Sequence, residues 1–191
     1  MSDPVRPIAT SSQTVGPFFH FGLATDASLG QVVATDATGE RIQLRIRVLD
    51  GAGQPVPDAL IEVYHADADG NYGQPAAGAG VRGFYGFGRL ATNADGICTF
   101  TTIKPGVVRS GAVEQAPHVN VCFLSRGLLR QIYTRIYFEG DAGAAGDPIL
   151  GLVPAERRHT LMARRPAPAE PGTWDFVIRL QGEDETVFFD L

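Results

Sequence analysis

The chain has 191 residues, of which 44% are hydrophobic and 19% charged, and this balance excludes an intrinsically disordered or fibrous protein. A chain of this length buries about 70% of its unfolded surface, which is enough for one hydrophobic core. Its formal net charge of -5 lacks the cationic excess that a nucleic-acid backbone requires, so we expect no nucleic-acid partner.

Turn-forming residues divide most of the chain into short segments that are typical of strands. There are 23 glycines and 13 prolines, and they cluster between short apolar runs. Residues 1–13 have no such run, and we expect them to form an extended arm. The clearest strand is 41–50, because apolar residues alternate there with polar ones, as on a half-buried sheet; the apolar positions are Ile42, Leu44, Ile46 and Val48.

Five further strands are expected, over residues 60–65, 97–103, 118–125, 131–138 and 173–180. We expect 60–65 and 97–103 to be antiparallel neighbours. The pattern predicts one short helix over 154–163, with Pro154 near its first turn. The remaining long segments, 74–83 and 141–147, are expected to be surface loops. The predicted fold is all-β: an antiparallel β-sandwich with long loops, an extended N-terminal arm and one or two short helices.

The sequence also bears on location and on thiol chemistry. No run approaches 18 apolar residues, and the first ten residues lack the apolar core of a signal peptide. We therefore expect a cytoplasmic protein with no membrane partner. Cys98 and Cys122 lie in apolar stretches of a domain that needs no disulfide, so we expect both to be free thiols.

Common catalytic signatures do not occur: the sequence has no phosphate-binding glycine loop, nucleophile elbow or paired-cysteine zinc spacing. One pair of residues is suggestive. His118 and Asn120 lie two apart in a predicted strand, so their side chains share one face of the sheet, where such a pair can hold a metal. Because a carboxamide is a weaker ligand than imidazole for a trivalent cation, the pair amounts to half of a metal site.

Several motifs nevertheless occur together and in a specific order. They lie at residues 50–59, 61–67 with Gly70 and Tyr72, 102–106, 117–118 and 137–141. In this combination the chain resembles the intradiol ring-cleavage dioxygenases over about residues 45–180. The resemblance implies an antiparallel β-sandwich and a reaction in which oxygen is inserted between the two hydroxyl-bearing carbons of a catechol. It also implies a ferric ion held by two tyrosines and two histidines.

Two of the four iron ligands of that family are missing from this chain. Tyr72 and His118 stand where the first tyrosine and the first histidine are expected, whereas Val108 and Asn120 occupy the other two positions. Valine offers no donor and asparagine only a neutral one, so we expect this chain to bind no metal and to contain no catalytic residue. Arg135 stands where the catalytic relatives carry glutamine, and its charge would further disfavour Fe(III).

The resemblance therefore implies an alpha-type subunit that acts with a homologous beta chain in a heteromer. The Fe(III) would lie on the beta chain, and the substrates would be protocatechuate (3,4-dihydroxybenzoate) and O2, giving 3-carboxy-cis,cis-muconate. Residues 1–22 would form the arm and 23–191 a single domain. In the arm, the residues expected to line the mouth of the partner's substrate cavity are Thr14, Gly16, Pro17 and Phe18, the last in place of a tyrosine found in many relatives.

Other interpretations remain open from the sequence. Arg135 either contacts the substrate carboxylate or neutralises a buried acid. Tyr72 and His118 are interpreted as ordinary packed residues, and the arm as a segment that only clasps the partner or also lines its cavity. The whole chain could instead be a homomeric dioxygenase whose metal site is rebuilt with His65 or His159, or a β-sandwich binding module that shares only residues 55–59 with the family.

Overall fold

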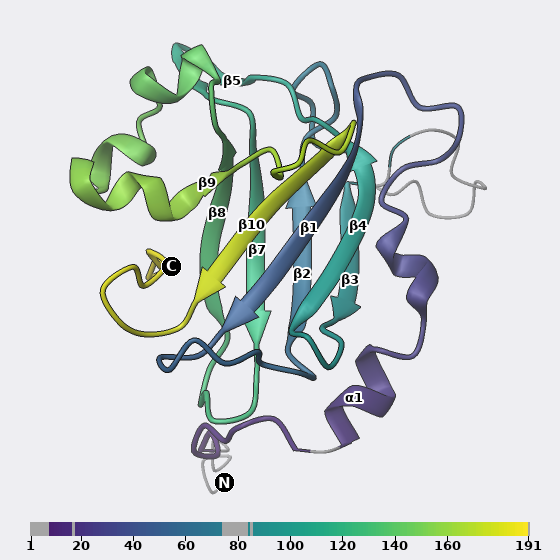
Figure 1. The fold of residues 1–191 in the computed structure, drawn as a ribbon, viewed down its shortest axis with the longest axis vertical. Helices are drawn as coiled ribbons and strands as arrows, with labels where there is room; N and C mark the ends of the chain where they lie inside the picture. Colours follow the sequence, from purple (N-terminus) through teal and green to yellow (C-terminus); the bar gives the residue numbers. More distant parts are fainter. Residues whose placement is uncertain (1–7, 17, 74–83, 85, 191) are drawn as a thin grey trace, which may run out of the picture.

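Two β-sheets face each other across one apolar core in the computed structural model, which describes residues 8–16, 18–73, 84 and 86–190 (Figure 1). The first sheet has the order β10-β1-β4, formed by Thr173–Arg179, Arg41–Leu49 and Ile97–Ile103. The second has the order β3-β2-β7-β8-β9, formed by Phe87–Ala91, Leu60–His65, His118–Leu124, Ile132–Phe138 and Met162–Ala163. A separate hairpin pairs β5 (Val108–Ser110) with β6 (Val113–Gln115).

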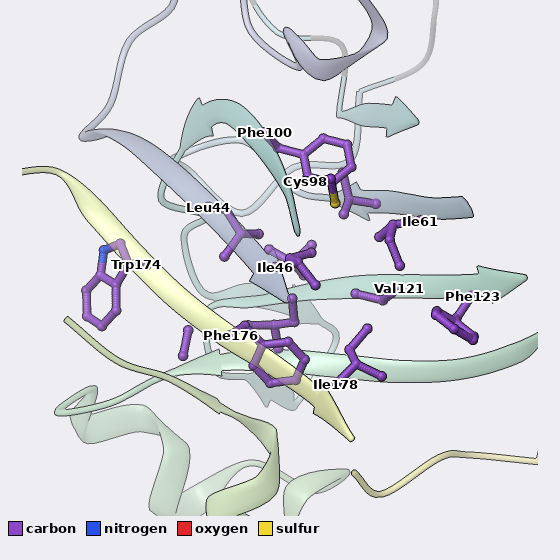
Figure 2. Packing of buried hydrophobic residues seen from close by; sticks show 14 of the residues in the cluster. Leu44, Ile46, Ile61, Cys98, Phe100, Val121, Phe123, Trp174, Phe176 and Ile178 are labelled. Atoms are coloured by element: carbon purple, nitrogen blue, oxygen red, sulfur yellow. The ribbon is translucent and has the colours of Figure 1, made fainter. Parts of the chain in front are cut away.

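The core is built by the inward residues of both sheets. Along β1 every second side chain is buried, and the residues between them face solvent. Figure 2 shows how aromatic and aliphatic side chains of the two sheets meet, among them Leu44, Phe100, Val121 and Phe176. The alternating pattern of the sequence is therefore explained by a sheet with one buried face.

The six predicted strands are all present, with ends within one residue of the expected ones. Four short strands were not predicted: β3, β5, β6 and β9. In β3 the signal is masked by Gly88, which the sequence pattern treats as a turn residue. A Cβ at Gly88 would lie 2.6 Å from Val32 Cγ2, so the strand needs glycine for close packing.

The expected pairing of 60–65 with 97–103 is wrong. β2 lies between β3 and β7 in one sheet, whereas β4 runs antiparallel to β1 in the other. The sheets are also not wholly antiparallel, because β10 runs parallel to β1 and β9 runs parallel to β8. Alternation identifies the buried face of a strand, but it does not identify the strand's neighbour.

Helices are short and lie in the connections. The α-helix α1 spans Phe18–Leu23, and 3-10 helices span Ala27–Gly30, Ala142–Gly146, Leu150–Leu152 (η3) and Ala155–Leu161. The last replaces the helix expected over 154–163: Pro154 is its N-cap and strand β9 follows directly. No helix in the described part of the chain is long and apolar enough to cross a membrane.

The segment 141–147 is only partly the surface loop that was expected. It contains a 3-10 helix capped by Asp141, but Asp147 at its end is buried, with 2% of its surface exposed. Asp147 accepts hydrogen bonds from the Tyr137 hydroxyl and from the amide of Ala116, among others, which explains why a carboxylate is tolerated inside the protein. The predicted loop 74–83 lies outside the described residues. Both cysteines are free thiols, as expected.

Candidate functional site

The outer face of the five-stranded sheet brings together the residues that sequence analysis associated with a metal site. In β7 the valines at 119 and 121 point into the core, so His118 and Asn120 lie on the opposite face. The register places Asn120 between Tyr64 on β2 and Arg135 on β8. The His118–Asn120 pair therefore has the shared face that the strand period predicted.

Tyr72 reaches this face through a tight loop that follows β2. The Asp67 carboxylate accepts the Asn71 amide at 2.8 Å, and the Asp67 carbonyl accepts the Gly106 amide, also at 2.8 Å. Gly70 has a φ of +86°, and a Cβ there would lie 1.9 Å from the Val107 carbonyl oxygen. Only glycine fits this approach. The loop is thus fixed against residues 106–107, which sets the position of Tyr72.

Tyr72, His118 and Asn120 form a closed hydrogen-bond network. His118 Nδ1 lies 2.7 Å from the Ala116 carbonyl oxygen, which can only accept, so Nδ1 carries the proton and Nε2 is the acceptor. The Tyr72 hydroxyl, 3.1 Å away, donates to Nε2. The Asn120 amide nitrogen donates to the Tyr72 oxygen at 3.0 Å and to the Tyr64 carbonyl at 3.1 Å. Each of these polar groups has a partner within the chain.

The electrostatics keep the network uncharged near neutral pH. Burial raises the pKa of Tyr72, although hydrogen bonding from Asn120 and the positive charge of Arg135 act in the opposite direction. Burial also lowers the pKa of His118, and Arg135 lowers it further. The phenol and the imidazole are therefore both neutral, and they satisfy each other's hydrogen bonds.

This donor set does not fit a ferric ion. Fe(III) favours anionic and imidazole donors, whereas Asn120 offers only a neutral amide beside Tyr72 and His118. Val108 begins β5 and offers no donor atom. Within the described residues, no group of three or more His, Cys, Asp or Glu side chains is arranged to hold a metal.

Arg135 is held by a neutral partner. Its Nη1 donates to Gln115 Oε1 at 2.7 Å, at the end of the β5–β6 hairpin. None of the ion pairs among the described residues includes Arg135. Arg135 also hydrogen-bonds to the Tyr137 hydroxyl, which in turn donates to the buried Asp147 carboxylate at 2.9 Å. Both interpretations of Arg135 therefore stay predictions.

A cleft of about 480 Å³ lies beside this network on the same face of the sheet. Residues of β2, β7 and β8 form its floor, and residues of η3 and of the C-terminal segment border it. The lining comprises Glu62, Val63, Tyr64, Phe87, Asn120, Val121, Cys122, Tyr133, Thr134, Arg135, Ile149, Leu152, Phe189 and Asp190. Sequence reasoning identified only Asn120 and Arg135 here, because the others are recognisable only once the strand register is known.

The arm residues lie elsewhere. Thr14 is exposed, and its hydroxyl oxygen accepts the Gly127 amide at 2.9 Å in the turn between β7 and β8. Gly16 is exposed, with nothing within 4 Å of a Cβ placed there. Phe18 begins α1, and Pro17 lies outside the described residues. The contacts of the Tyr72 network include neither Thr14 nor Gly16.

The two histidines considered for a rebuilt metal site hydrogen-bond to partners outside the Tyr72 network. His65 is fully buried, with its ring nitrogens bonded to the Ala66 carbonyl and the Thr102 hydroxyl, both at 2.8 Å. His159 is exposed and lies 3.1 Å from Asp184. In the part of the chain that the structure describes, neither belongs to a metal-ligating cluster.

Comparison with known proteins agrees with the sheet architecture and with the motifs. Residues 14–182 match the family model described as Dioxygenase. The chain is 43% identical to the protocatechuate 3,4-dioxygenase alpha chain of Burkholderia cepacia, covering 95% of this chain and 97% of that one. The corresponding alpha chain of Pseudomonas putida is also 43% identical, with 95% and 96% covered. The beta chain of Burkholderia cepacia is 32% identical, with 97% and 81% covered.

Solved structures show the same fold. The dioxygenase domain of a carbohydrate-binding fusion protein from Streptomyces sp. SirexAA-E superposes with a TM-score of 0.59 at 24% identity, covering 93% of this chain and 99% of that one. Hydroxyquinol 1,2-dioxygenase from Pseudomonas putida DLL-E4 gives a TM-score of 0.60 at 21% identity, with 91% and 68% covered. These matches extend over most of the chain. They exclude the interpretation that the chain is a binding module that shares only residues 55–59 with the family.

Proposed function

This chain belongs to the intradiol dioxygenase family, and from that membership we propose that it is the alpha subunit of an alpha/beta protocatechuate 3,4-dioxygenase. The observation that carries the proposal is the difference in identity: 43% to alpha chains over 95% of the sequence, against 32% to a beta chain. The alpha and beta relatives are named as separate chains, which supports a heteromer.

In this proposal the ferric ion lies on the beta chain. Intradiol dioxygenases depend on iron, and the Tyr72–His118–Asn120 network does not supply a suitable donor set. The partner's iron would supply the activation of catechol and O2. The reaction adds both atoms of O2 to 3,4-dihydroxybenzoate and cleaves the bond between the two hydroxyl-bearing carbons, which yields 3-carboxy-cis,cis-muconate.

The contribution of this chain is then assembly and a wall of the substrate cavity. We assign the wall to Thr14, Gly16, Pro17 and Phe18 of the arm. Two features support this assignment: Thr14 and Gly16 are exposed, and the Thr14 side chain bonds to its own domain through one hydrogen bond, to Gly127. Exposed backbone near a glycine and a proline can approach a flat ring closely.

The test is to produce the chain alone and together with a homologous beta chain. The complex is expected to contain iron and to consume O2 when 3,4-dihydroxybenzoate is added. The isolated full-length chain is expected to contain no stoichiometric iron and to consume no O2. An isolated chain that carries iron and turns over the substrate would refute the proposal, and so would a failure of the two chains to associate.

A further inference from the structure

The outer face of the three-stranded sheet lies on the opposite side of the sandwich from the Tyr72 network (Figure 1). β1 and β10 are adjacent and parallel in this sheet, so their outward side chains form matched rows. Val177 is the register partner of Arg47, and Arg179 follows on the same face of β10. Arg47 and Arg179 are therefore diagonal neighbours, with Cα atoms roughly 8 Å apart.

These two arginines carry positive charge that the fold does not compensate. Elsewhere on the same face the charges are paired: Arg45 donates to Asp175 at 2.6 Å and to Glu170 at 3.3 Å. Among the residues that the structure describes, neither Arg47 nor Arg179 has an ion pair or a side-chain hydrogen bond. This local positive charge lies on a chain whose formal net charge is -5.

Aliphatic surface surrounds the two arginines. Val177 is 43% exposed, and two partly exposed residues, Ile97 and Leu49, are the register partners of Arg47 and Arg179. We call these five residues the arginine patch. Arginine is enriched at protein interfaces, where its long side chain lies over apolar neighbours. The composition of the arginine patch therefore favours a protein partner with acidic groups.

An acidic turn, residues 182–185, borders the arginine patch. It follows shortly after β10, and the Thr186 amide donates to the Arg179 carbonyl at 2.9 Å, which holds the turn at the end of the strand. Two of its acidic residues, Glu183 and Glu185, have no ion pair within the described part of the chain. The chain thus presents unpaired carboxylates beside unpaired guanidiniums without joining them.

We propose that the arginine patch docks a second copy of this chain across a twofold axis, with Arg47 and Arg179 of each copy against Glu183 and Glu185 of the other. A twofold contact uses the same surface on both copies, so that surface must be complementary to itself. A cationic patch beside an anionic turn meets this requirement, because the rotation places each opposite its counterpart. The inference does not rest on the proposed function, and a copy bound here leaves the Tyr72 face of the sandwich open.

The dimer is expected to be weak and sensitive to salt. Exposed ion pairs contribute little individually, and the aliphatic surface is small, so we expect a dissociation constant of about 10 to 100 µM at low ionic strength. Raising the salt concentration to about 0.5 M should weaken association about tenfold or more, because exposed charges are then screened. Sedimentation velocity of the full-length chain at several concentrations and salt levels measures both quantities.

Exchanging the charges gives a sharper test. R47E/R179E places like charges opposite each other in a dimer, and so does E183R/E185R, so each variant alone should be monomeric at concentrations where the unchanged chain is dimeric. In a mixture of the two variants, both contacts of the twofold pair regain opposite charges. The mixture should therefore form a one-to-one heterodimer, and its formation would also show that both variants are folded.

The matched control is R126E/R130E, which changes the net charge by the same amount at two exposed arginines in the turn between β7 and β8. This control should dimerise like the unchanged chain. The inference is overturned if the unchanged chain stays monomeric at about 100 µM and low salt, if either R47E/R179E or E183R/E185R alone dimerises as the unchanged chain does, or if their mixture stays monomeric. Loss of dimerisation in R126E/R130E would attribute the association to net charge and would also overturn it.

Discussion

The hydroxyl of Tyr72 donates to Nε2 of His118 across 3.1 Å, so the two side chains that we expected at metal-ligand positions bond to each other. A ligand pair normally directs its lone pairs at a common ion. Here the phenol proton of Tyr72 points at the His118 Nε2 lone pair, and the Asn120 amide donates to the Tyr72 oxygen. The three side chains thereby form a polar cluster on the sheet whose members satisfy one another's hydrogen bonds.

Restoring the missing donors should restore iron binding. We expect V108Y/N120H/R135Q to take up Fe(III) and to show the visible absorption of iron-bound tyrosinate, because it adds a phenolate and an imidazole and removes a cation. The unchanged chain should take up substoichiometric iron under the same conditions. Metal analysis and absorbance spectra measure both.

The matched control is V113Y/N120H/R135Q, which adds a tyrosine at an exposed position of the same hairpin. This control should bind much less iron than the variant with tyrosine at 108. Equal uptake by the two variants would show that Val108 does not occupy a ligand position.

Substituting Phe18 tests the proposed wall of the partner's cavity. In the alpha/beta complex, F18A should raise the KM for 3,4-dihydroxybenzoate about fivefold, as expected for the loss of roughly 1 kcal/mol of ring contact. The iron content should not change. Leu23, at the other end of α1, provides the control L23A. Unchanged kinetics in F18A would restrict the arm to assembly.

His65 should make the stability of the fold depend on pH. Burial lowers its pKa from 6.5 to about 4, and the nearby His118 acts in the same direction. The folded state therefore favours the neutral ring. The stability that this preference adds to the fold is fully present above pH 6.5 and is lost as the pH falls toward 4. Between pH 7 and pH 5 the free energy of unfolding should fall by about 2 kcal/mol from this group.

Urea unfolding at several pH values measures this dependence. The variant H65Q removes the titrating ring, so its stability should change less between pH 7 and pH 5 than that of the unchanged chain. His118 also has a lowered pKa and contributes to the slope that remains. Identical slopes for the two proteins would contradict the assignment to His65.

Asp147 should be a major determinant of stability. Its carboxylate accepts hydrogen bonds from the Tyr137 hydroxyl and from the amides of Ala116, Ile149 and Leu150, at 2.7 to 2.9 Å. In D147N an NH2 group must face one of these donors, so we expect a loss of about 2 to 3 kcal/mol in the free energy of unfolding. D184N, at an exposed position, should change it by less than about 0.5 kcal/mol.

The strands could be predicted because their alternation follows directly from one buried face. β1 and β10 show this most clearly, with ends within one residue of the expected ones. Their parallel pairing could not be predicted, because the residues that pair, such as Arg45 and Asp175, are 130 positions apart. β3 was missed because two of the glycines that shape it, Gly86 and Gly88, resemble turn signals.

Within the site, the strand period correctly placed His118 and Asn120 on one face. The roles of Gln115 and Tyr64 were missed, because a glutamine and a tyrosine carry no signal until the hairpin and the register bring them to Arg135 and Asn120. Asp147 was assigned to a loop because acidic residues are seldom buried. Its four donors come from three separate segments, which no local pattern reveals.

The parallel pairing of β1 with β10 also has a consequence during synthesis on the ribosome. β1 leaves the exit tunnel early, yet one of its edges stays open until residues 173–179 emerge. Until then Ile46 and Val48 lack their neighbours Phe176 and Ile178 on β10. The nascent chain therefore exposes apolar surface and an unpaired strand edge. Chains that stall before this point should be clients of ribosome-associated chaperones.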